Sequence, residues 1–168
     1  MAKPTKKVEP RDVLYRIKRG LSAYVSYLAA CEMNEAFSEY VLYEPILRVL
    51  TARGYTVQCE YECPGIERKG PGDKKRIDFF ATKDDVQMAI EVKWAANSKP
   101  KLEKDIEKLK AFHAQNKDGF PMLCIFGKES VLSNFEIDES LFKEWGTQRV
   151  ADLGVTRYGC RFFRLRTQ

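Results

Sequence analysis

The sequence predicts an α/β fold in which a central mixed β-sheet is flanked by helices. Apolar residues recur at helical spacing in several segments, and short alternating or continuous apolar stretches lie between them. The resulting order is helix, helix, three strands, helix, strand, helix, strand. Three neighbouring strands followed by a crossover helix and another strand predict both antiparallel and parallel pairs in one sheet.

The first two elements are predicted to be helices. Residues 11–33 carry an amphipathic apolar stripe, formed by Val13, Leu14, Ile17, Leu21, Tyr24, Val25 and Leu28. Asn34 is a candidate cap for a second helix that continues to Arg53, with Gly54 as its C-terminal stop. Pro45 lies within this second helix, where it either kinks the helix or marks a restart.

Three strands are predicted next. Residues 55–63 alternate between apolar and polar side chains, which is typical of a half-buried strand. The loop 64–75 is rich in glycine, proline and lysine and is expected to be exposed. Strands at 76–82 and 87–95 are separated by a short polar turn, which is the spacing of a β-hairpin.

The remaining elements complete the sheet. Residues 102–115 form a helix with an apolar stripe, and 120–127 form a continuous apolar strand buried on both faces. A short helix is expected near 138–145, before a final strand over 159–166. This last strand interleaves aromatic and basic residues, which suits either a nucleic-acid surface or an edge strand with arginines on its open face.

Composition limits the class of protein. The chain has 168 residues, of which 44% are hydrophobic and 32% charged, so we expect a basic, mobile tail over 1–10 and one globular domain over 11–168. No apolar run approaches the roughly 20 residues that span a bilayer. The N-terminus also lacks the apolar segment of a signal peptide. We therefore expect a cytoplasmic protein without a membrane partner.

Two further features exclude other functions. The single histidine, His113, makes a histidine-based metal site or a Ser-His-Asp triad improbable. No glycine-rich phosphate loop is present, so nucleotide hydrolysis is unsupported. The net charge of +5 is compatible with a polyanionic partner but does not require one.

The predicted hairpin carries charge inside apolar strands. Asp78 lies in its first strand, and Glu91 and Lys93 lie in its second. Burial of charge is costly unless the charges are paired, hydrogen-bonded or bound to a metal. Side-chain alternation places Ile77 and Phe79 on one face and Asp78 on the other, so Asp78 is expected close to Glu91 or Lys93 on one face.

This grouping indicates a metal site. Two adjacent carboxylates repel, and one of them takes up a proton unless a cation lies between them. Mg²⁺ (or Mn²⁺) suits such a site, because it favours carboxylate and water oxygens. The ion would activate a water and neutralise phosphate charge, and a nearby lysine would orient or deprotonate that water. The alternative is an ordinary cross-strand Glu–Lys pair on a solvated strand face, which the flanking Phe and Trp residues argue against.

The motif resembles that of the PD-(D/E)xK nuclease superfamily, which has the restriction-endonuclease-like fold. The resemblance is carried by Asp78 and by the run Glu91, Val92 and Lys93 in the next strand. The proline that precedes the aspartate in the family motif is replaced here by Ile77. The motif alone is loose, because D…ExK occurs often by chance, and its position in the right order of elements strengthens it.

The order of elements strengthens this resemblance. Residues 35–127 resemble the family's αβββαβ core, to which the chain adds an N-terminal helix and a C-terminal helix–strand extension. The helix after the hairpin resembles the one that often follows the motif, with Asp105 and Lys108 in a D-x-x-K-L arrangement.

The resemblance implies a Mg²⁺-dependent endonuclease acting on DNA. Asp78 and Glu91 would bind the metal, the Val92 carbonyl would be a further ligand, and Lys93 would position the attacking water. Small members of the family often dimerise to cut both strands, and the helix over 11–33 is an available interface. The rival hypothesis is a non-catalytic nucleic-acid-binding or protein-interaction module on the same fold.

A further acidic residue is expected from the second helix. At about 100° per residue, Glu39 falls near the middle of the apolar stripe, whereas Glu44 points toward solvent. We therefore predict Glu39 as a catalytic and metal-binding residue, with Glu35, one turn earlier, as the second choice. The alternative is an ordinary ion-paired helix glutamate.

Basic residues surround the predicted site. They form either a phosphate-binding rim or a solvated charged surface. The group comprises Arg68, Lys69, Lys74, Lys75, Arg76, Lys101, Lys104, Lys108 and Lys110.

Overall fold

The computed structural model describes residues 10–33, 40–66 and 75–166. Its elements, in chain order, are α1 (Arg11–Ala30), η2 (Tyr40–Leu42), α2 (Tyr43–Ala52), β1 (Thr56–Glu62), β2 (Arg76–Lys83), β3 (Val86–Trp94), α3 (Glu103–Gln115), β4 (Phe120–Lys128), α4 (Glu129–Leu132), β5 (Phe142–Glu144), β6 (Arg149–Ala151) and β7 (Tyr158–Leu165).

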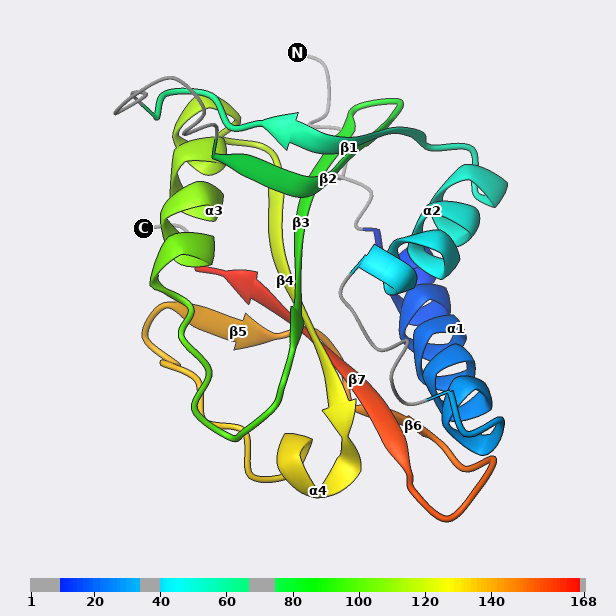
Figure 1. The fold of residues 1–168 in the computed structure, drawn as a ribbon. Helices are drawn as coiled ribbons and strands as arrows, with labels where there is room; N and C mark the ends of the chain where they lie inside the picture. Colours follow the sequence, from blue (N-terminus) through cyan, green and yellow to red (C-terminus); the bar gives the residue numbers. More distant parts are fainter. Residues whose placement is uncertain (1–9, 34–39, 67–74, 167–168) are drawn as a thin grey trace.

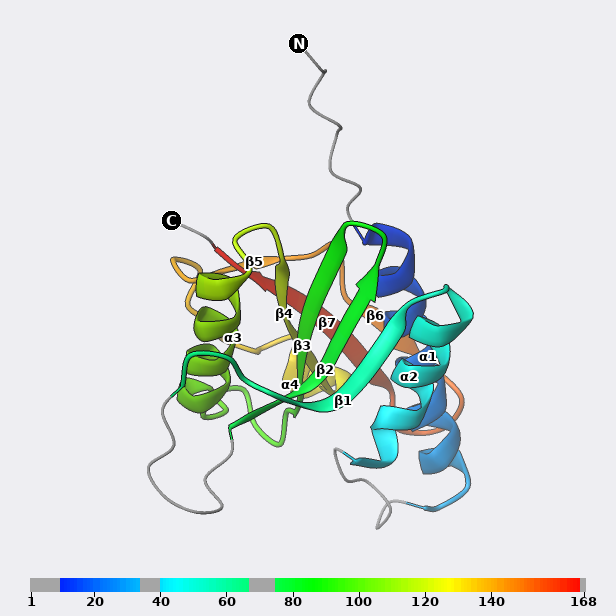
Figure 2. The same cartoon turned by 90° about the horizontal axis from the view of Figure 1, so that it is seen from above.

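The strands form one mixed sheet. Its order is β1-β2-β3-β4-β7-β5, and β6 also pairs with β7. The β3–β4 pair is parallel and is connected through α3, while the other pairs are antiparallel. Helices α1 and α2 cover one face of the sheet and α3 covers the other (Figures 1 and 2). The predicted class, a mixed sheet flanked by helices, is confirmed.

Two apolar layers hold the sheet between the helices. Ile17 of α1 and Ile46 of α2 pack with Ile90 on one face, and Leu109 and Phe112 of α3 pack on the other. Strand β4 contributes alternate residues to both layers and is buried along its length except at Lys128. Burial of β4 on both faces was predicted from its continuous apolar run and is confirmed.

Helix α2 ends as predicted. Gly54 adopts a left-handed φ of 79° after the last helical residue, and its N–H donates to the Thr51 carbonyl at 2.9 Å. Pro45 lies in the first turn of α2, where its missing N–H has no intrahelical acceptor to lose. Pro45 therefore marks the restart of the helix as α2 after η2, and it does not kink a helix in its middle. Asn34 lies outside the described residues.

The C-terminal part differs from the prediction in two places. The helix expected near 138–145 is wrong, because the described helix is α4, at 129–132, and residues 142–144 form β5. The edge position considered for the last strand is also wrong, because β7 lies between β4 and β5. Arg161 of β7 donates to both carboxylate oxygens of Glu144, at 2.9 and 2.8 Å, so its charge is paired within the sheet.

Helix α1 is bound to the chain along one face. The buried side chains Lys18, Ser22 and Ser26 donate to backbone carbonyls of residues 145, 147, 149 and 151. A dimer through α1, which remains a prediction, would have to use another side of the helix, such as the one that exposes Tyr27.

The N-terminal boundary shifts by one residue. Residues 1–9 of the predicted tail lie outside the described part of the chain, but Pro10 is buried and its carbonyl accepts the Leu14 N–H of α1. Within the described ranges, no helix has the length and apolar character needed to cross a membrane.

Candidate functional site

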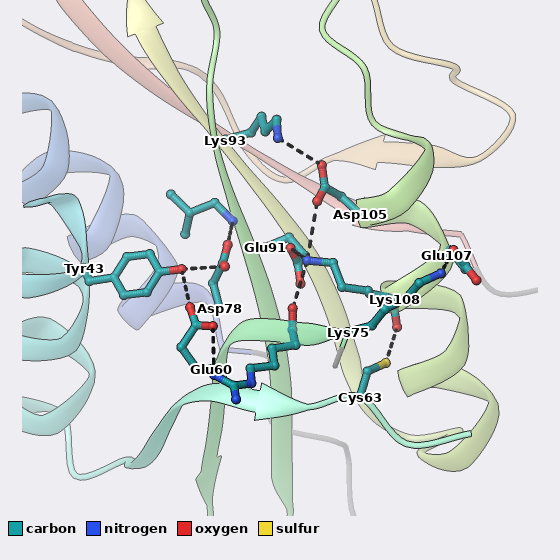
Figure 3. A network of polar contacts seen from close by, with 12 residues as sticks. Tyr43, Glu60, Cys63, Lys75, Asp78, Glu91, Lys93, Asp105, Glu107 and Lys108 are labelled. Carbon is teal, nitrogen blue, oxygen red and sulfur yellow. Dashed lines mark hydrogen bonds and ion pairs between the residues drawn. The ribbon is translucent and has the colours of Figure 1, made fainter. Parts of the chain in front are cut away.

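The candidate site begins where β2 stops pairing with β3. Their ladder runs from Lys83 opposite Val86 to Phe79 opposite Ile90. Just beyond it, Oδ2 of Asp78 accepts the backbone N–H of Val92 at 2.6 Å. The side chain of Asp78 therefore takes the position of a backbone acceptor and lies in the gap between the two strands (Figure 3).

The sheet is distorted at this same position. Glu60, across from Asp78 in β1, has a φ of 52°, which is rare for a residue with a side chain and costs roughly 1–2 kcal/mol. Phe79 packs in the layer of α1 and α2, whereas Ile77 packs in the layer of α3. The prediction that Ile77 and Phe79 share a face is wrong, because the regular alternation of β2 breaks at Asp78.

Tyr43 connects α2 to this position. Its hydroxyl lies 2.5 Å from Oδ1 of Asp78 and 3.2 Å from Oε1 of Glu60, and its ring packs against Phe79 at a centroid distance of 4.6 Å (Figure 3). Burial and the two carboxylates raise the pKa of Tyr43 well above its ordinary value. The phenol therefore keeps its proton and acts as a donor.

Glu91 is buried beside Asp78. Only 1% of its surface is exposed, Oε2 accepts from the Lys108 ammonium, and Oε1 has no hydrogen-bond partner among the described residues. Burial raises the pKa of Glu91 to about 9, and the Asp78 carboxylate adds to this effect while Lys108 opposes it. In this structure Glu91 thus holds a proton at neutral pH unless a cation replaces it.

Lys108 is the internal cation of the site. Its ammonium also donates to the Arg76 carbonyl at 2.9 Å and lies 3.5 Å from Oδ1 of Asp105. Burial lowers the pKa of Lys108, but the Glu91 and Asp78 carboxylates outweigh burial and the net shift is upward. Lys108 therefore stays charged, and its predicted place on an exposed rim is wrong. Lys101, Lys104 and Lys110 are exposed, while Arg68, Lys69 and Lys74 lie outside the described residues.

Lys93 lies on the same side of β3 as Glu91, as predicted. Its ammonium is 3.7 Å from Oδ2 of Asp105, a buried residue of α3. Carboxyl and ammonium groups thus alternate from Glu91 through Lys108 and Asp105 to Lys93 (Figure 3). This arrangement connects both β3 residues to α3.

The acidic residues predicted from the second helix have different outcomes. Glu39 and Glu35 lie outside the described residues. Glu44 is half exposed and pairs with Arg48 one turn later, so its predicted orientation toward solvent is confirmed.

The donor set fits a hard divalent cation in part. Asp78 and Glu91 supply carboxylate oxygens, and the buried, unpartnered Oε1 of Glu91 is an atom that requires a cation or a proton. In the described ranges, no three His, Cys, Asp or Glu side chains gather into a group that could hold a metal. Any further ligands would have to be backbone carbonyls, waters or residues beyond those ranges.

Sequence reasoning missed the hydroxyl of Tyr43 and the position of Glu60, since both depend on how α2 and β1 pack against β2. For Asp105, the sequence does contain a pattern that indicates a buried carboxylate. It falls on the 102–105–109–112 spacing, in the middle of the apolar stripe of α3, where a carboxylate needs a buried partner.

Comparisons of the chain with protein-family models, with curated proteins and with solved structures found no match. The functional interpretation therefore depends on the geometry of this site.

Proposed function

We propose that the protein is a divalent-metal-dependent nuclease that hydrolyses phosphodiester bonds in DNA and has a restriction-endonuclease-like core. The observation that carries the proposal is the buried Glu91 carboxyl, which lies near Asp78 and has an oxygen without a hydrogen-bond partner among the described residues. Lys93 follows two residues later on the same side of β3. The order α2-β1-β2-β3-α3-β4 agrees with the αβββαβ order of the PD-(D/E)xK superfamily.

Each side chain has a distinct task in this proposal. Asp78 and Glu91 hold Mg²⁺ or Mn²⁺, and the Val92 carbonyl is a further ligand. When bound, the ion lowers the pKa of a coordinated water and neutralises charge on the scissile phosphate. Lys93 orients the attacking water and stabilises developing negative charge. Glu39 remains the proposed acidic residue from the helix side.

The α3 residues support these tasks without touching the reacting atoms. Asp105 holds the ammonium of Lys93 beside β3. Lys108 donates to Oε2 of Glu91 and holds this carboxyl group in place before a metal binds. The exposed Lys101, Lys104 and Lys110 would contact the DNA backbone, in keeping with the net charge of +5.

A non-catalytic nucleic-acid-binding module on the same fold is the second candidate. This candidate is favoured because donors of the protein itself form hydrogen bonds with the carboxyl groups of Asp78 and Glu91. Asp78 accepts from Tyr43 and Val92, and Glu91 accepts from Lys108. Such a network can serve stability alone, in which case the protein would bind DNA and leave it intact.

Cleavage of supercoiled plasmid and of branched DNA with Mg²⁺ tests the proposal. We expect the wild-type protein to cut at least one substrate and EDTA to abolish cutting. Asp78→Asn is expected to slow cleavage by at least about 100-fold, because a neutral amide holds a divalent cation poorly. Asp85→Asn, the same change at an exposed position in the hairpin turn, is the matched control and should leave the rate unchanged.

Two results would contradict the nuclease proposal. One is the absence of cleavage on every DNA and RNA substrate together with no Mn²⁺ binding by calorimetry. The other is DNA binding, by gel shift, that proceeds without cleavage and survives Asp78→Asn, which would favour the binding module.

A further inference from the structure

We propose that Tyr43 is a positioning residue, whose hydroxyl fixes the Asp78 carboxylate for cation binding, and that Glu60 is the second acceptor of this hydroxyl. The inference deepens the proposed function and rests on it, since it concerns a ligand of the proposed metal site.

The two oxygens of the Asp78 carboxylate are hydrogen-bonded by donors from two separate elements. Oδ1 faces the Tyr43 hydroxyl at 2.5 Å, and Oδ2 accepts the Val92 N–H at 2.6 Å. The donors come from the start of α2 and from the backbone of β3 (Figure 3). Hydrogen bonds to a charged acceptor are short and strong, and two of them fix the plane of the carboxylate. An ionised carboxylate has about four acceptor sites on its two oxygens, so a hydrogen bond to an oxygen is compatible with cation binding to the same group.

The Tyr43 hydroxyl has a second possible acceptor, the carboxylate of Glu60. A phenol has one proton to donate, yet the Tyr43 oxygen lies within hydrogen-bonding distance of two carboxylates, those of Asp78 and Glu60. Arg76, whose Nη1 lies 3.9 Å from Oε2 of Glu60, offsets part of the repulsion between them. If a cation binds Oδ1 of Asp78, the half-buried hydroxyl of Tyr43 can donate to Glu60 instead.

The backbone of Glu60 has an unusual conformation. Its φ of 52° is strained for a residue with a side chain, and it occurs at the position in β1 across from Asp78. Glu60 is half-buried, and its Oε1 lies 3.2 Å from the Tyr43 hydroxyl, so its carboxylate faces α2.

Tyr43→Phe tests the inference, because it removes one hydroxyl and retains the ring that packs on Phe79. Groups that orient metal ligands typically contribute roughly 10–100-fold to metal affinity. We therefore expect calorimetry to give a Mn²⁺ Kd that is weaker by this factor. Tyr55→Phe, the same change at the opposite end of the β1–β2 pair, is the matched control and should leave the Kd unchanged. Circular dichroism establishes that both variants are folded.

A second measurement separates positioning from a purely structural role. If Tyr43 positions Asp78, cleavage by Tyr43→Phe should require more Mn²⁺ for half-maximal rate and should recover the wild-type rate at saturating Mn²⁺. A loss that saturating Mn²⁺ does not restore would overturn the positioning role.

Failure of this inference is distinguishable from failure of the proposed function. Wild-type Mn²⁺ binding that Asp78→Asn abolishes and Tyr43→Phe leaves unchanged would overturn the inference alone. Absence of Mn²⁺ binding in the wild-type protein would overturn the proposed metal site and the inference with it.

Discussion

Between pH 6 and pH 8 the wild-type protein is expected to lose roughly 3 kcal/mol of unfolding free energy relative to a Glu91→Gln variant, both without metal. The fold raises the pKa of Glu91 from its ordinary 4.5 to about 9. Within this window the folded protein holds a proton that the unfolded chain releases, so stability falls as pH rises. Glutamine has no such proton, and the variant lacks this slope of about 1.4 kcal/mol per pH unit.

Urea unfolding at pH 6, 7 and 8 measures this difference directly. Glu103→Gln, the same change at an exposed position in the first turn of α3, is the control and should run parallel to the wild type. A stability difference between wild type and Glu91→Gln that stays constant with pH would contradict the prediction. It would mean that Glu91 is already ionised against Lys108 at pH 6.

Replacement of Lys93 by alanine is expected to lower the maximal rate of DNA cleavage by roughly 10²–10⁴-fold, the usual contribution of a positioned acid–base group. Asp105 holds the Lys93 ammonium beside β3, and alanine leaves no group there to orient water or stabilise the developing charge. The carboxylates of Asp78 and Glu91 remain, so metal binding should change little. The effect is therefore expected on the rate and not on the Mn²⁺ Kd.

Rates at saturating Mg²⁺ and DNA test this prediction, with Lys104→Ala as the control because Lys104 is exposed on α3. An unchanged maximal rate in Lys93→Ala would remove Lys93 from the chemistry. A loss confined to DNA affinity would instead identify Lys93 as a phosphate contact.

Local periodicity predicted much of the sheet and its helices. The hairpin, the apolar strand β4 and the stripe of α3 each have a repeat of apolar residues that requires no knowledge of neighbours. Local periodicity did not predict the strand within residues 138–145. Their short strand is defined by hydrogen bonds to β7, a partner that forms the end of the chain, and a three-residue strand has too few residues for a repeat.

The same limit applies to the candidate site. Glu91 and Lys93 could be placed on one side of β3 by counting, because β3 is regular. Asp78 could not, because the sheet twists at Asp78 and Glu60 and its side chain enters the gap between strands. The contact with Tyr43 depends on the packing of a separate helix, which no local pattern specifies.

The hydrogen bond from the Val92 N–H to a side chain has a spectroscopic consequence. Most amides within a sheet donate to a backbone carbonyl of a neighbouring strand. The Val92 amide donates to the carboxylate of Asp78, so its ¹⁵N–¹H resonance depends on the charge and ligation of that one group. A single backbone signal in solution NMR of the uniformly ¹⁵N-enriched protein would therefore follow occupancy of the site, without any substitution near it.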